Sequence, residues 1–504
     1  MRTLILVAAL TAAACSERPQ TEGKPAAVAP ADPAPEANPA PVANAEPSAE
    51  FEGLDAGERF YGIYMKAQGQ LFKVGWMRQS TEVEGDIRLE TEMYAEIVGM
   101  GTKQTVQLDE TRSYDRQGEL KTLSFEQKAA TGSTRIDGTV SGKTLNVKVT
   151  SGGVAAEQRY PVAETLRDFV AASGLAIRGE VGATARSSRF DPSVQKQLTT
   201  EFKVLALEKR NFAGVETTTV KIESKTPELG VTETAWYDRS GTVLESRIGG
   251  FFKASLESPE VAKRIDSNED FIKGGVVVPP EPIANPTGLE RLRLELAGVE
   301  QELPQTPRQQ VKRAGEKTTV TLSRDAAPTQ SWSLSQKAPK SMDEFLKPTP
   351  FIQSDDAEIV RVAREVAGDA TDVFTVTSRL TEYVYHAIRD EYVPAYSNAK
   401  EALTSGRGDC TEHAVLFVAM ARALGIPARV AVGVAYWPPG DGFGWHAWAE
   451  VNGDGEWFAV DPTWNQPIAD ATHLKLAGGG PAEQSKVVML MGQVRIVDLT
   501  SSGG

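Results

Sequence analysis

The sequence predicts an α+β protein, in which N-terminal antiparallel β structure precedes a core with a central helix packed on an antiparallel sheet. Three observations indicate this fold class. Residues 51–275 alternate apolar and polar side chains between glycine-containing turns, which is typical of antiparallel strands. An apolar helix is predicted from Cys410, and three strand-like segments follow it. A length of 504 residues with 40% hydrophobic content predicts about two to four domains with ordinary cores.

The N-terminus predicts a targeting segment. Residues 1–15 combine an arginine at position 2, a short apolar stretch and the small residues Ala12-Ala13-Ala14 before Cys15, a pattern typical of secretory leaders. Because this segment ends at cysteine, it resembles a bacterial lipoprotein signal peptide and lipobox. The resemblance implies lipidation of Cys15 and a periplasm-facing location in the cell envelope, anchored in the outer membrane. Ordinary cleavage after Ala14 is the alternative.

Residues 16–50 predict a tether. They consist largely of alanine, proline and glutamate with almost no large apolar side chains, so they cannot bury a core. We expect a disordered or polyproline-like segment that reaches on the order of 100 Å when extended.

Residues 51–275 predict a β-rich domain. Strands are expected at 60–77, 87–97 and 103–114. Residues 110–118 and 233–241 both begin with Glu-Thr and share Tyr-Asp-Arg-x-Gly, which suggests a duplicated β unit, although turn chemistry alone would also produce the match.

Prolines mark the next boundary. The segment Val278-Pro279-Pro280-Glu281-Pro282 separates the β-rich domain from residues 285–335, which we expect to form a small β module or a connector. Residues 340–504 then form the expected catalytic domain.

Cys410 is the first candidate for chemistry, because Cys15 is the only other cysteine. It follows a glycine-containing loop and Asp409, a good helix N-cap, and the helix predicted after it ends at Gly425. The first turn of a helix favours a thiolate through the helix dipole, and its N–H groups can donate to an oxyanion.

His446 and Asp461 are the next candidates. Strands are expected at 428–436, 446–451 and 456–461, with a hairpin turn at 452–455. On antiparallel neighbours, His446 and Asp461 lie roughly opposite each other, so that the carboxylate can hold the imidazole. A thiol, a base and an orienting carboxylate are the parts of a thiol acyl-transfer site.

Four separated blocks resemble transglutaminase-like cysteine enzymes, over roughly Asp356 to Pro467. They are Gly408-Asp409-Cys410, residues 422–429 (Arg-Ala-Leu-Gly-Ile-Pro-Ala-Arg), His446-Ala447-Trp448 and Asp461-Pro462-Thr463. The resemblance implies a papain-like fold, a Cys410 nucleophile, a His446 acid/base, an orienting Asp461 and a thioester formed from a protein or peptide amide. It implies no cofactor and no metal. Because the family includes cross-linkers, deamidases, peptidases and peptide N-glycanases, hydrolysis and transfer both stay open. The β-rich domain resembles curved sheets found ahead of such cores in bacterial envelope proteins.

Other residues near these motifs have separate expectations. Trp437 and Trp445, on a glycine- and proline-rich loop, are expected to wall an acyl-acceptor channel and bind substrate. His413 is expected to project away from the thiol, whereas His386 and His473 are expected to be structural or exposed. Residues 452–456 place oxygen ligands at alternate positions as a calcium loop does, but a hairpin turn explains them better.

The charge of the chain limits its partners. A net charge of −14 argues against nucleic-acid binding and against a broad basic surface for anionic lipid. Membrane contact is therefore expected only through Cys15. Three function classes remain: a lipid-anchored periplasmic enzyme, a non-catalytic envelope binding or scaffold protein, and an assembly factor whose β-rich domain binds lipid or lipoprotein.

Overall fold

The computed structural model describes residues 51–503 except 52–53, 55, 68, 84, 100, 130–131, 152–153, 213, 266–267, 328–332, 335–337, 393–397, 454 and 479. The expected leader, the lipobox at Cys15 and the tether of residues 16–50 lie outside the described residues. They therefore stay predictions. In the part of the chain that is described, none of the helices is both long enough and apolar enough to span a bilayer.

The N-terminal part is antiparallel β structure, as predicted, and its described strands form one sheet of 14 strands. The strand order is β8-β7-β6-β5-β4-β3-β2-β1-β14-β13-β12-β11-β10-β9. The strands are β1 (Gly57–Ala67), β2 (Gln70–Glu82), β3 (Ile87–Gly99), β4 (Thr102–Tyr114), β5 (Leu120–Ala129), β6 (Gly132–Ser141), β7 (Thr144–Ser151), β8 (Val154–Pro161), β9 (Thr184–Asp191), β10 (Lys196–Phe212), β11 (Val215–Thr226), β12 (Val231–Tyr237), β13 (Val243–Ile248) and β14 (Phe252–Glu257). Alternate residues of β3 are buried, which is the period that the sequence shows.

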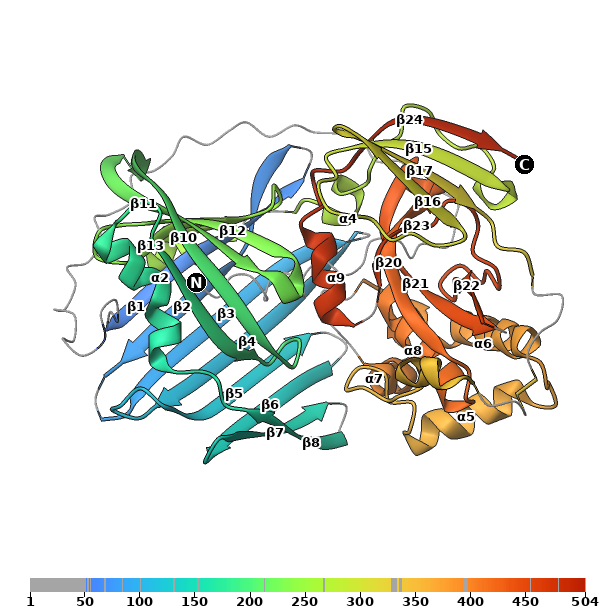
Figure 1. Ribbon diagram of the computed structural model, residues 1–504, viewed down its shortest axis with the longest axis horizontal. Coiled ribbons are helices and arrows are strands. Elements are labelled where there is room, and N and C mark those ends of the chain that lie inside the picture. Colours follow the sequence, from blue (N-terminus) through green and yellow to red (C-terminus); the bar gives the residue numbers. More distant parts are fainter. Residues whose placement is uncertain are drawn as a thin grey trace.

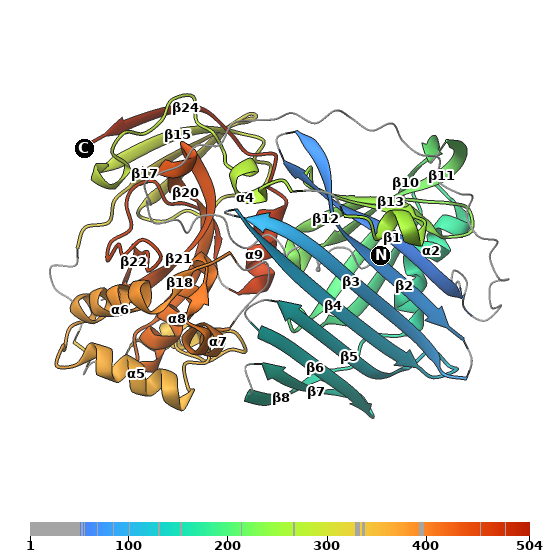
Figure 2. The same ribbon diagram turned by 180° about the vertical axis from the view of Figure 1, so that it is seen from behind.

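The sheet curls, so that β10–β13 lie in front of β2–β4 in Figure 1 and behind them in Figure 2. Helix α2 (Leu166–Arg178) joins the outermost strands β8 and β9. It begins at a capping box between Thr165 and Asp168 and ends at Gly179, which adopts the left-handed conformation. Each half of the sheet can therefore bury its inner face against the other half and α2.

The two repeated segments form equivalent turns. Asp115, between β4 and β5, accepts hydrogen bonds from the backbone N–H groups of Gln117 and Glu119. Asp238, between β12 and β13, accepts them from Ser240 and Thr242. The shared Tyr-Asp-Arg-x-Gly thus encodes the same aspartate-stabilised turn twice.

A buried ion network lies inside this domain. The Arg112 guanidinium, 3% exposed, donates to Glu110 Oε1 at 2.5 Å and also to Glu164. The Tyr114 hydroxyl donates to the other oxygen of Glu164 at 2.5 Å. Since these charges are removed from water, the network is stable only while all its partners are present.

A small four-stranded sheet with the order β16-β17-β15-β24 follows. Its strands are β15 (Arg291–Ala297), β16 (Gln309–Ala314), β17 (Lys317–Ser323) and β24 (Arg495–Ser502). Three of them fall within the small module expected at 285–335. The fourth, β24, comes from residues that were expected to belong to the catalytic domain. Strands of this small sheet therefore come both before and after that domain in the sequence.

The remaining part combines helices with a second four-stranded antiparallel sheet of order β22-β21-β20-β23. The strands are β20 (Ala428–Trp437), β21 (Gly442–Gly453), β22 (Glu456–Val460) and β23 (Leu474–Gly478). The helices are α5 (Ala357–Ala367), α6 (Val373–Ala387), α7 (Ala399–Ser405) and α8 (Cys410–Ala423). Helix α8 contacts α5, α6 and α7 on one side and β20 and β21 on the other, and it is buried over nearly its whole length. Figure 1 shows it between the other helices and the sheet.

The short elements are α3 (Pro259–Ala262), α4 (Phe271–Gly274), the two-residue strands β18 (Arg389–Asp390) and β19 (Arg407–Gly408), and α9 (Pro481–Val488). Helices α4 and α9 contact strands of both the large sheet and the C-terminal sheet, whereas α3 packs on β1 and β14, and β18 pairs with β19. Beyond α4, Val277 pairs with Phe443 at the start of β21, and the Trp445 indole donates to the Gly275 carbonyl at 3.0 Å. The connector from the β-rich domain is therefore attached to the strand that carries His446.

Candidate active site

Cys410 is the first residue of α8. Asp409 caps the helix by accepting from the Thr411 N–H at 2.9 Å, and Glu412 accepts from the Asp409 N–H at 2.8 Å. This capping box explains why the helix begins at the cysteine, as Asp409 predicted. The Asp409 side chain also accepts from the Glu412 N–H, so two of the N–H groups considered for an oxyanion are engaged by the cap. The Cys410 side chain is completely buried.

His446 and Asp461 are in contact, as the hairpin register predicts. His446 lies on β21 and Asp461 directly follows β22, and the His446 Nε2 to Asp461 Oδ2 distance is 2.9 Å. The other carboxylate oxygen accepts from the N–H groups of Thr463 and Trp464 at 2.8 and 3.3 Å. The Trp464 ring stacks on the imidazole, with centroids 4.3 Å apart and planes at 11°. Backbone N–H groups thus hold the Asp461 carboxylate, and the Trp464 ring holds the His446 imidazole.

The second imidazole nitrogen is placed differently. His446 Nδ1 is buried and has no hydrogen-bond partner among the described residues. Because Nε2 is bound to the carboxylate, Nδ1 is the nitrogen of this ring that can exchange a proton with another group.

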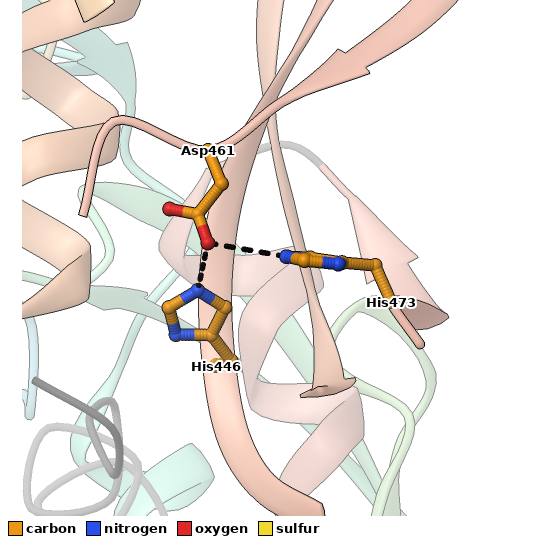
Figure 3. Close-up of side chains that lie close together, drawn as sticks. All are labelled: His446, Asp461 and His473. Atoms are coloured by element: carbon orange, nitrogen blue, oxygen red, sulfur yellow. Dashed lines mark hydrogen bonds and ion pairs between the residues drawn. The ribbon is translucent and has the colours of Figure 1, made fainter. Parts of the chain in front are cut away.

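His473, which was expected to be structural or exposed, is 1% exposed and joins the pair. Its Nε2 is 3.1 Å from the same Asp461 Oδ2, and its Nδ1 is 3.1 Å from Asp470 Oδ1. Figure 3 shows the Asp461 carboxylate between the two rings. Asp470 and His473 follow Asp461 within 12 residues. That proximity to a candidate carboxylate was the signal available in the sequence.

The pKa values of Asp461, Asp470 and His473 are all shifted from their usual values. Burial would raise the pKa of Asp461, but the charges and hydrogen bonds of His446 and His473 outweigh it and hold the pKa well below its usual range. Burial is likewise outweighed at Asp470, mainly by the charge of His473, and its pKa falls to about 2. Burial would lower the pKa of His473, but Asp470 and Asp461 outweigh burial and raise it to about 9. At neutral pH, two carboxylates therefore flank a charged His473.

The other two histidines lie elsewhere. His413 is buried beneath the helix cap, where its Nδ1 is 2.7 Å from the Asp409 carbonyl oxygen and its Nε2 is 3.7 Å from Asp390 Oδ1. It is part of the support of the α8 N-terminus and does not join the His446–Asp461 pair. His386 is exposed on α6, as expected.

The tryptophans around the site are mostly core residues. Trp437 and Trp445 are only 1% and 4% exposed, so the expected channel wall has almost no open indole surface at either position. Trp464, which is partly exposed, stacks on His446 and is the indole nearest to that ring, whereas the buried Trp448 lies beside His446 and His473. The position of Trp464 three residues after Asp461 could have indicated this.

The donor atoms of His446, Asp461 and His473 lie within 4.8 Å of one another, and histidine and carboxylate are common metal ligands. All three are already engaged in the two hydrogen bonds to Asp461 Oδ2. These hydrogen bonds are therefore enough to explain why the three side chains lie so close together.

Comparison with protein families matches residues 360–462 to the transglutaminase-like superfamily. The match covers about a fifth of the chain and includes α8, β20, β21 and β22, with Cys410, His446 and Asp461. The segment is a transglutaminase-like domain. The resemblance seen in the sequence motifs is therefore confirmed for this part of the chain.

No curated protein matches the sequence. Among solved structures, a candidate cysteine protease from Cytophaga hutchinsonii is 17% identical, with a TM-score of 0.29, over 43% of this chain and 84% of that one. A β-barrel-like protein of a domain family of unknown function from Brucella abortus is 13% identical, with a TM-score of 0.31, over 40% and 97% of the two chains. Likenesses this weak carry no argument about activity.

Proposed function

We propose that the transglutaminase-like domain is a thiol enzyme that forms a thioester on Cys410 from a protein or peptide amide. In this proposal His446 is the general acid and base, and Asp461 orients it within a papain-like core. The observation that carries the proposal is the buried His446–Asp461 hydrogen bond, which leaves Nδ1 of the ring for proton exchange. Cys410 begins the helix that packs on the strand of His446, which supports its role as nucleophile.

The first half of the reaction forms the acyl-enzyme. The Cys410 thiolate attacks the amide carbonyl carbon, and the carbonyl π electrons move to oxygen to give a tetrahedral intermediate. When these electrons return, the C–N bond breaks, and the leaving nitrogen takes the proton held on His446 Nδ1. The products are a thioester on Cys410 and a free amine.

The second half removes the acyl group. Water or a second amine attacks the thioester while His446 Nδ1 accepts its proton, and the C–S bond breaks to restore the thiolate. Attack by water is hydrolysis, whereas attack by an amine is acyl transfer. The proposal includes both outcomes, because the same three residues serve each of them.

Asp461 supports these steps through its charge state. A carboxylate that stays ionised can only accept hydrogen bonds, so it keeps a hydrogen on His446 Nε2 and thereby selects the tautomer with Nδ1 available. The stacked Trp464 ring restricts rotation of the imidazole. Together they favour one ring orientation through both halves of the reaction.

We further propose that the chain is anchored in the bacterial outer membrane by lipid on Cys15 and faces the periplasm. The pattern of residues 1–15 supports this location.

The alternative function is a non-catalytic envelope module that uses the domain for recognition. The burial of Cys410 and Asp461, both 0% exposed, is the observation that favours this alternative, because a substrate must reach the sulfur.

Alkylation and acylation of the thiol test the proposal. Iodoacetamide should modify Cys410 well below the pH that an ordinary thiol of pKa near 8.5 requires, as followed by peptide mass spectrometry between pH 5 and 9. An activated acyl ester should leave a hydroxylamine-sensitive thioester on the wild type. The Cys410→Ala variant, which should fold because a methyl group replaces a thiol of similar size, assigns the label.

Two results would count against an enzyme. One is an alkylation profile that matches free cysteine, and the other is acyl labelling that persists in Cys410→Ala. A wild type that is inert to both reagents while folded would support the recognition module instead.

A further inference from the structure

We propose that His473 is a positioning residue of this site. It acts as a buried imidazolium, held by Asp470, that shares the Asp461 carboxylate with His446 and sets the charge that His446 experiences. The inference rests on the proposed function, because it gives His473 a part in the proton transfers assigned to His446.

The protonation of His473 follows from its partners. Nε2 lies 3.1 Å from Asp461 Oδ2, and Nδ1 lies 3.1 Å from Asp470 Oδ1 and 3.2 Å from the Asp470 carbonyl oxygen. Carboxylate and carbonyl oxygens only accept hydrogen bonds, so both ring nitrogens must carry hydrogen. A ring with hydrogen on both nitrogens is a cation. His446 differs because only its Nε2 has such a partner, so its Nδ1 can gain and lose a proton.

The loop from Asp461 to His473 holds both carboxylates. Asp470 Oδ1 accepts from the Thr472 N–H and hydroxyl at 2.9 and 2.6 Å, and Oδ2 accepts from the Gln466 side-chain amide at 2.9 Å. Gln466 also exchanges two backbone hydrogen bonds with Asp461, at 2.8 and 2.9 Å. From the small sheet side, the Arg308 guanidinium donates to the Asp470 carbonyl at 2.7 Å. Because the side chain of Asp470 has this many donors, it is held ionised against His473.

Among the described residues, Asp461 and Asp470 are the two acids that contact His473 directly. The Trp448 and Trp464 rings approach it edge-on, with centroids 5.1 and 5.6 Å away. Charged groups outside the cluster include Arg308, which pairs with Asp325 at 2.9 Å, and the group of Lys475, Glu450 and Arg429. In that group, Glu450 accepts from Lys475 at 2.5 Å and from Arg429 at 2.6 Å. Asp461 and Asp470 are therefore the groups that stabilise the His473 charge.

The charge of His473 lies close to His446. The two imidazole centroids are 5.7 Å apart, and both rings bind one carboxylate oxygen. The positive charge of His473 therefore offsets part of the negative charge that Asp461 places beside His446. Loss of the His473 charge should accordingly favour the protonated form of His446 relative to the wild type.

The ring-nitrogen NMR signals of His473 test the charge without any need for catalysis. The full chain contains four histidines, so ¹⁵N-labelled imidazoles can be assigned with single variants. We expect His473 to keep hydrogen on both nitrogens at pH 7 and to titrate near pH 9. A neutral His473 at pH 7 would overturn the proposal. This result stays decisive if Cys410 forms no acyl-enzyme, which would refute the proposed function alone.

The pH profile of acyl-enzyme formation tests the effect on His446. His473→Gln keeps a side-chain amide donor but removes the charge, so the alkaline limb should move up by about 1–2 pH units, the size expected for one charge at this separation. Asp470→Asn should shift the limb in the same direction, and the double variant should shift it no further. His386→Gln, which changes an exposed histidine, should match the wild type. A slower reaction with an unshifted limb in His473→Gln and Asp470→Asn would show a purely structural role and overturn the inference.

Discussion

The replacement Asp461→Asn gives the sharpest test of how the carboxylate works. Its Oδ1 accepts two backbone N–H groups and its Oδ2 accepts the two imidazoles. If the asparagine oxygen keeps the backbone donors, its NH₂ group faces two N–H groups. His446 must then move its hydrogen from Nε2 to Nδ1, which is the wrong tautomer for accepting a proton from the thiol.

The magnitude follows from these contacts. In serine proteases the equivalent change lowers kcat on the order of 10⁴. A thiol needs less help from the base, because a thiolate–imidazolium pair forms before substrate binds, so we expect acylation to slow by about 10²–10³. The variant also loses two hydrogen bonds to a buried charge. At about 1.5–3 kcal/mol each, the free energy of unfolding should fall by about 3–6 kcal/mol.

Single-turnover acylation measures the first effect, with rapid quenching and intact-protein mass spectrometry. Urea unfolding measures the second and establishes the fraction folded. Asp498→Asn, on the exposed side of β24, is the matched control and should change neither. Wild-type acylation in Asp461→Asn would remove Asp461 from the site. A loss as large as that of Cys410→Ala, with both variants folded, would refute the reasoning about a preformed ion pair.

Three further predictions concern stability and location. The pKa of His473 is raised from 6.5 to about 9 on folding, so its stabilising contribution is complete below pH 6.5 and is lost as pH rises through 9. Unfolding free energy should therefore fall by roughly 3 kcal/mol over this interval in the wild type, but not in His473→Gln. Arg112→Met should destabilise the β-rich domain by about 3–5 kcal/mol, seen as a lower urea midpoint, because it leaves buried carboxylates unpaired. Cys15→Ser should move the protein from the membrane to the soluble fraction, and unchanged fractionation would contradict lipid anchoring.

The parts of the site that follow from local pattern could be predicted. Asp409 and the glycine-containing loop before it locate the start of α8, and the turn between β21 and β22 places His446 near Asp461. His473 could not be placed in this way. It precedes β23, which pairs with β20 rather than with its sequence neighbour β22, so a crossover brings it back to the site.

The same limit applies to the fold. Alternating polarity identifies the strands of the large sheet, because one face of each strand is buried. It does not say which strands are neighbours when they are far apart in sequence. The pairing of β24 with β15, such as Leu499 with Leu294, depends on apolar residues that would suit many partners.

The position of β1 has a consequence for how the β-rich domain folds. Strands β1 to β8 form one meander of local hairpins and β9 to β14 form another. The backbone ladder between the two meanders is the pairing of β1 with β14, as in Ile63 opposite Ala254. The pairing of β1 with β14 joins residues that are separated by nearly the whole sequence of the domain, and such non-local pairing is slow. During synthesis β1 emerges long before its second neighbour exists, so its edge must wait exposed until β14 is made. The rate at which β1 pairs with β14 should therefore govern both the folding time of the domain and its tendency to aggregate.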